Sequence, residues 1–69
     1  MNEIKTLAEA LPYQIQRCTK LVGRYKEIGP NGAFGAMMIQ RDIDAAIKAC
    51  AEGDLVAMIR CCKALQECN

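Results

Sequence analysis

The chain contains no histidine, no serine and no tryptophan. Without histidine it lacks the side chain that enzymes use most often as a general base near neutral pH, and the usual nitrogen ligand for transition metals. Without serine, every serine-nucleophile triad is excluded. We therefore expect a protein that is not an enzyme, with no catalytic residues, no cofactor and no metal site.

Long hydrophobic runs are also missing, although 52% of the 69 residues are apolar. Charged residues interrupt each apolar run well before the ~20 residues that a membrane span needs, so no membrane segment is predicted. The first residues lack the layout of a signal peptide. Five cysteines are an odd number, and no two form a C-x-x-C pair, which argues against a secreted disulfide scaffold. We expect reduced thiols and a cytoplasmic location.

Neither sign of charge is in excess, since nine Lys and Arg face eight Asp and Glu. Dedicated nucleic-acid binders are strongly basic and often stack bases on aromatic rings. This chain has only three aromatic side chains, Tyr13, Tyr25 and Phe34, so nucleic acid is not the expected partner. A domain this small buries only about 60% of its unfolded surface and needs reinforcement. The composition favours oligomerisation as that reinforcement.

Strand signals are scarce, because the chain has two valines, two threonines and no apolar–polar alternation. Helix formers fill three segments that are separated by Gly29-Pro30-Asn31-Gly32 and by Gly53-Asp54. We predict one all-α domain over residues 1–69. Its three helices are expected at about 3–28, 33–52 and 55–67.

Individual residues indicate how these helices begin, bend and end. Pro12 lacks a backbone N–H, so the first helix is expected to kink there or to begin afresh. Gly53 suits the left-handed position after a helix, and Asp54 suits the N-cap of the next one. The short connection predicts that the second and third helices form an antiparallel hairpin.

The first segment carries the most regular pattern, in which seven side chains are spaced alternately four and three residues apart. They are Ile4, Ala8, Leu11, Ile15, Cys18, Val22 and Tyr25. A heptad stripe of this kind packs against another helix. We predict that these seven residues, called here the dimer seam, join two copies in an intertwined homodimer.

The other two segments each have an apolar face at the period of a helix. The expected core residues are Ala36, Ile39, Ile43, Ala46, Ile47 and Cys50 in the second, and Leu55, Met58, Ile59, Cys62 and Leu65 in the third. A free cysteine on such a face behaves as a small hydrophobe. A redox role is open only for Cys61 or Cys68, if either is exposed.

The opposite side of the second helix carries apolar side chains where water is expected. This outer face consists of Phe34, Met37, Met38, Arg41, Ala45 and Lys48. Methionine adapts to many surfaces, and Phe and Arg are enriched at interfaces. We predict that the outer face binds a partner protein. The alternative is that a dimer mate covers it.

A basic stripe lies opposite the dimer seam on the first helix, where Tyr13, Arg17, Lys20 and Arg24 are spaced four, three and four apart. Such a stripe is most often a solvated helix face, but it also suits phosphates or an acidic protein surface. We predict that Arg17, Lys20 and Arg24 form a charged rim beside the partner site. A nucleic-acid-binding regulator that uses this stripe is the alternative function.

Two stretches of the chain carry a resemblance to known proteins. They are YKEIGPNGAFGAMMI at 25–39 and EGDLVAM at 52–58. Both resemble small early proteins of temperate Mu-like phages. Among these phage proteins is the quorum-sensing anti-activator of Pseudomonas phages. The resemblance implies a helical homodimer that acts in the host cytoplasm, inhibits a LuxR-type transcription activator and binds a type IV pilus assembly ATPase. It also implies partner contacts through aromatic side chains of the second helix, where this chain has Phe34 alone. We expect a phage-type interaction protein that inhibits a host protein. A purely structural assembly module is a further alternative.

Overall fold

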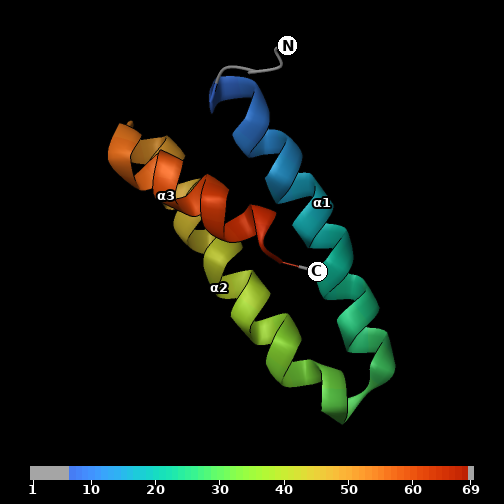
Figure 1. The fold of residues 1–69 in the computed structure, drawn as a ribbon. Helices are drawn as coiled ribbons and strands as arrows, with labels where there is room; N and C mark the ends of the chain where they lie inside the picture. Colours follow the sequence, from blue (N-terminus) through green and yellow to red (C-terminus); the bar gives the residue numbers. More distant parts are fainter. Residues whose placement is uncertain (1–6, 69) are drawn as a thin grey trace.

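The computed structural model describes residues 7–68, which form three helices (Figure 1). They are α1 (Leu7–Ile28), α2 (Pro30–Glu52) and α3 (Leu55–Gln66). α1 and α2 run in opposite directions from a shared turn and diverge towards their other ends, and α3 folds back from the end of α2 towards α1 (Figure 1). The predicted all-α fold is confirmed for the part of the chain described.

α1 continues through Pro12 as one helix, so it does not begin afresh at the proline. Pro12 is exposed, and so is Ala8, whose carbonyl would otherwise accept from the N–H that proline lacks. A bend of the helix axis at Pro12 stays a prediction. Residues 3–6, predicted as the first turn of this helix, lie outside the described residues.

The turn between α1 and α2 is much shorter than predicted. Only Gly29 separates the helices, and its φ of 99° and ψ of −153° are accessible to glycine. Pro30 then opens α2, because a residue in the first helical turn needs no N–H for the helix ladder. The expected start at residue 33 is therefore wrong, since Asn31 and Gly32 already belong to the first turn.

Two glycines of α2 allow it to touch α1. Gly32 is buried, and a Cβ atom built on it would overlap the backbone carbonyl of Tyr25. A Cβ atom at Gly35 would lie 2.5 Å from Cδ2 of the Tyr25 ring. These glycines serve the contact between the helices rather than the turn.

The junction between α2 and α3 follows the sequence prediction. Gly53 ends α2 in the left-handed conformation at φ 68°, and its N–H donates to the carbonyl of Cys50 at 3.2 Å. Asp54 donates its N–H to the carbonyl of Ala49 at 3.1 Å, which completes a Schellman motif. The Asp54 side chain then accepts from the N–H of Ala57 at 3.1 Å and caps α3.

α3 contacts both α1 and α2, and its last turn reaches α1 (Figure 1). The antiparallel hairpin of the second and third helices stays a prediction. The core that the three helices enclose combines Ala and Cys with Leu, Ile and Val side chains. Its buried apolar residues are Leu11, Cys18, Val22, Ala36, Ile39, Ile43, Ala46, Ala49, Cys62 and Leu65.

The predicted dimer seam is mostly the core of the single chain. Leu11, Cys18 and Val22 are buried, and Ile15 and Tyr25 pack against them. Ala8 is exposed, and Ile4 lies outside the described residues. Since α2 and α3 of the same chain fill this stripe, a second copy can use it only if the fold opens.

Four predicted core residues are exposed instead. The exposed fractions are 51% for Ile47, 62% for Leu55 and 59% for Ile59, and Cys50 is exposed as well. The buried apolar residues of α2 are Ala36, Ile39 and Ile43 and then Ala46 and Ala49, so burial in its second half lies away from Ile47 and Cys50. Periodicity identified an apolar face but not this shift in the direction of burial along it.

Substitution of Gly32 by alanine tests the helix contact. The added methyl group meets the backbone of Tyr25, so we expect Gly32→Ala to lower the free energy of unfolding by about 1–3 kcal/mol. Gly23→Ala is the control, because Gly23 lies in α1 with open space around its Cα, and it should raise stability by about 0.5–1 kcal/mol. Urea titrations followed by circular dichroism measure both. Equal effects of the two substitutions would contradict the contact.

Candidate protein-binding surface

Within residues 7–68, the pair formed by α1 and α2 has one face covered by α3 and one face open. On the covered face, Arg17 of α1 and Asp42 of α2 both approach Cys68, two residues beyond the end of α3. On the other face, Thr19 of α1 and Gln40 and Asp44 of α2 are exposed. A single short helix therefore shields one side only.

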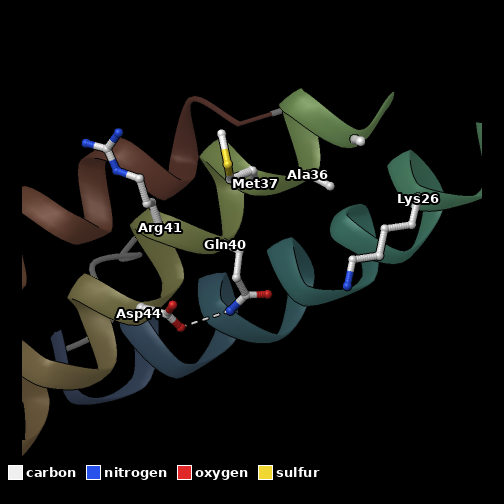
Figure 2. A pocket seen from close by; sticks show the side chains of 7 residues that line it. Lys26, Ala36, Met37, Gln40, Arg41 and Asp44 are labelled. Atoms are coloured by element: carbon white, nitrogen blue, oxygen red, sulfur yellow. Dashed lines mark hydrogen bonds between the residues drawn. The ribbon is translucent and has the colours of Figure 1, made fainter. Parts of the chain in front are cut away.

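A pocket of about 340 Å³ lies where α1 and α2 border the open face (Figure 2). Its lining residues are Lys26 from α1 and Ala33, Ala36, Met37, Gln40, Arg41 and Asp44 from α2. Along α2, the amide of Gln40 donates to Asp44 Oδ1 at 2.9 Å (Figure 2). Alanine and methionine thus provide an apolar lining, with the cations Lys26 and Arg41 among them.

All six residues of the outer face are exposed. The exposed fractions of its large apolar side chains are 68% for Phe34, 54% for Met37 and 40% for Met38. Two of the six, Met37 and Arg41, also line the pocket. The predicted exposure is confirmed, whereas a role in binding stays a prediction.

Sequence reasoning missed the contribution of Lys26, Gln40 and Asp44 to this surface. Lys26 comes close to α2 only because the turn is a single residue, which the Gly-Pro-Asn-Gly cluster did not reveal. The spacing of Gln40 and Asp44, four residues apart on one helix, was a signal that could have found that pair.

The basic stripe does not stay together, because Arg17 turns away from it. Its guanidinium donates to the carbonyls of Leu65 at 2.6 Å and Cys68 at 3.1 Å, and Nε donates to Gln14 Oε1 at 3.0 Å. Arg17 is half-buried, whereas Tyr13, Lys20 and Arg24 are exposed. The prediction that Arg17 belongs to a charged rim is therefore wrong, and the stripe loses a cation that nucleic-acid binding would use.

Arg17 instead completes the end of α3. The last carbonyls of a helix have no partner within the helix and carry partial negative charge. A guanidinium supplies several donors and a positive charge at the same point. In the sequence, Leu65 lies 48 positions after Arg17, and Cys68 lies 51 positions after it. The two hydrogen bonds therefore fix the C-terminal end of α3 against α1.

The thiols near this contact are shielded. Cys18 is buried and donates to the carbonyl of Leu65 at 3.4 Å, and burial raises the pKa of Cys62. The pKa of Cys68 is also raised, first by burial and then by Cys18 and Asp42, while Arg17 opposes the shift. A raised pKa keeps a thiol protonated and less nucleophilic. Cys50, predicted in the core, is exposed.

Comparison with protein-family models, with curated proteins and with solved structures found no match for this chain. Within residues 7–68, no helix combines the length and the apolar character needed to cross a bilayer. Over the same residues, no three His, Cys, Asp or Glu side chains lie close enough together to hold a metal ion.

Removal of the Arg17 side chain tests its structural role. Arg17→Ala leaves the carbonyl of Leu65 in α3 and that of Cys68 just beyond it without their charged donor, so we expect a loss of about 1.5–3 kcal/mol in the free energy of unfolding. Lys20→Ala is the control on the exposed side of α1, with an effect within about 0.5 kcal/mol. Thermal and urea denaturation measure the difference. If both variants are as stable as the wild type, Arg17 does not secure α3.

Proposed function

We propose that this chain is a non-enzymatic interaction protein that binds another protein through the outer face of α2 and inhibits it by covering its surface. The observation that carries the proposal is the exposure of Phe34, Met37 and Met38 on a helix whose opposite side is already buried in the core. Apolar surface removed from water stabilises a complex by about 25 cal/mol per Å². Burial of the outer face against a partner would therefore supply free energy of binding, because folding of the chain alone leaves this apolar surface in water.

The charges around this face indicate the chemistry of the partner. Arg41 and Lys48 belong to the outer face, and Lys26 lines the adjoining pocket. The carboxylate of Asp44 accepts a hydrogen bond from Gln40. We propose a partner surface that is apolar at its centre and carries carboxylates at its edge, with exposed Lys20 and Arg24 as more distant cations. A host transcription activator or pilus ATPase is the kind of partner that the phage resemblance suggests.

A homodimer is part of the same proposal. Phe34, Ile47, Leu55, Val56 and Ile59 each expose more than half of their surface in the single chain. A second copy would cover some of this apolar surface and reinforce a small core. The dimer seam predicted on α1 is filled, so the contact between copies must lie elsewhere.

Affinity capture from a host lysate tests the partner-binding role. The variant Met38→Ala/Arg41→Ala removes an apolar group and a cation from the outer face. We expect captured partner to fall at least about tenfold, because buried interface centres concentrate binding energy in a few side chains. Quantitative mass spectrometry of the eluates measures this loss.

The control is Val56→Ala/Arg60→Ala, which makes the same kind of change at exposed positions of α3. It should capture the partner as the wild type does. Circular dichroism verifies that both variants fold. Equal capture by the wild type and both variants would exclude the outer face as the binding surface.

A further inference from the structure

On the open face, α2 carries a stripe of exposed residues in addition to the outer face. The order of side-chain types along this stripe is the same when it is followed from either end. Six exposed residues are spaced four, three, four, three and four apart, namely Ala33, Met37, Gln40, Asp44, Ile47 and Ala51. Along this α2 stripe, the side chains are small, large, polar, polar, large and small. A heptad stripe suits packing against another helix, and within the described residues no helix of this chain covers it.

The order of side chains fits a second copy of the same helix in the opposite direction. An antiparallel α2 centred on residue 42 places Ala33 opposite Ala51 of the second copy, and Met37 opposite its Ile47. Gln40 then faces Asp44 of the second copy. Each contact occurs twice, as a two-fold symmetric interface requires.

The polar centre of the stripe sets both the direction and the register. Gln40 uses one amide hydrogen for Asp44 of its own chain at 2.9 Å. In the antiparallel pair its second amide hydrogen can donate to Asp44 of the second copy, because a carboxylate can accept several hydrogen bonds. The four side chains would then form a closed set of hydrogen bonds. A parallel pairing would instead place two Asp44 carboxylates together, and a shifted register would bury polar groups against Met37 or Ile47.

The surrounding structure leaves room for this pairing. α3 covers the other face of α1 and α2 and therefore does not obstruct the stripe. Alanine at both ends allows two helix backbones to approach closely. The stripe extends over about 27 Å of helix at 1.5 Å per residue.

We propose that a second copy of this chain docks antiparallel on the α2 stripe, which makes this stripe, rather than the dimer seam on α1, the interface between copies. The inference rests on the homodimer of the proposed function. It takes Met37 from the outer face and leaves Phe34, Met38, Arg41, Ala45 and Lys48 on the adjoining side of α2, available to a different protein.

Sedimentation equilibrium of the purified full chain over about 1–200 μM tests the inference, since self-association depends on concentration. The wild type should reach the mass of two chains. Met37→Lys and Ile47→Glu should each weaken the dimer at least about tenfold, because each buries a charge against an apolar side chain. An equimolar mixture of the two variants should regain a dimer, since the introduced lysine of one copy faces the introduced glutamate of the other.

Two further variants make the test specific. Ile59→Glu is the matched control, because Ile59 on α3 is 59% exposed and Ile47 is 51% exposed; it should dimerise as the wild type does. Gln40→Lys should tighten the dimer several-fold, because each new ammonium group faces Asp44 of the second copy. This second variant changes only an exposed polar side chain, so it tests the interface even if an acidic residue at position 47 disturbs folding.

Three results would overturn the inference: a monomeric wild type throughout the range, dissociation by Ile59→Glu but not by Ile47→Glu, or a mixture that does not recover the dimer. The proposed partner-binding role is tested separately, by the capture of a partner from lysate. A chain that stays monomeric but captures a partner through Met38 and Arg41 refutes the α2 stripe alone. A dimer that needs Ile47 but captures nothing refutes the partner-binding role alone.

Discussion

The single-residue turn at Gly29 is the constraint on which the rest of this structure depends. It brings the first turn of α2 against the last turns of α1, and only a glycine at position 32 fits beside the carbonyl of Tyr25. From that point the two helices diverge, and α3 fills the space between them from one side (Figure 1). The hydrogen bonds of Arg17 hold α3 there. Since one helix of 12 residues covers only one face, the other face of the pair stays open.

Helix ends and caps could be predicted from the sequence, whereas contacts between residues far apart in the chain could not. Gly53 and Asp54 were identified because a helix end and an N-cap depend on the nearest few residues. The stripe of Leu11, Cys18 and Val22 was identified as a packing surface, but periodicity does not say whether the neighbour is another helix of the same chain or a second copy. Arg17 looked like one cation in a row of three, because its partners lie about fifty residues further along the chain.

The errors in the predicted core have a similar cause. A helix period defines a face but leaves its edges undetermined. Ile47 lies on one edge of the face centred on Ile43 and is exposed, whereas Ala46 on the other edge, and Ala49 beyond it, are buried. Which edge is buried depends on where α3 crosses α2, and that depends on the contact of α3 with α1. The outer face was easier to predict, because residues opposite Ile43 are exposed whichever edge α3 covers.

The open face also explains why polar residues stand within an otherwise apolar stripe. If Gln40 and Asp44 were leucines, the stripe would pair equally well in several registers and with many apolar surfaces. A polar pair at the centre weakens those alternatives, because its groups must find hydrogen-bond partners. In the proposed dimer, the two copies satisfy one another at this centre. The outer faces of both α2 helices then belong to one assembly, so a partner that is itself dimeric would engage two sites with the gain in avidity that such linkage gives.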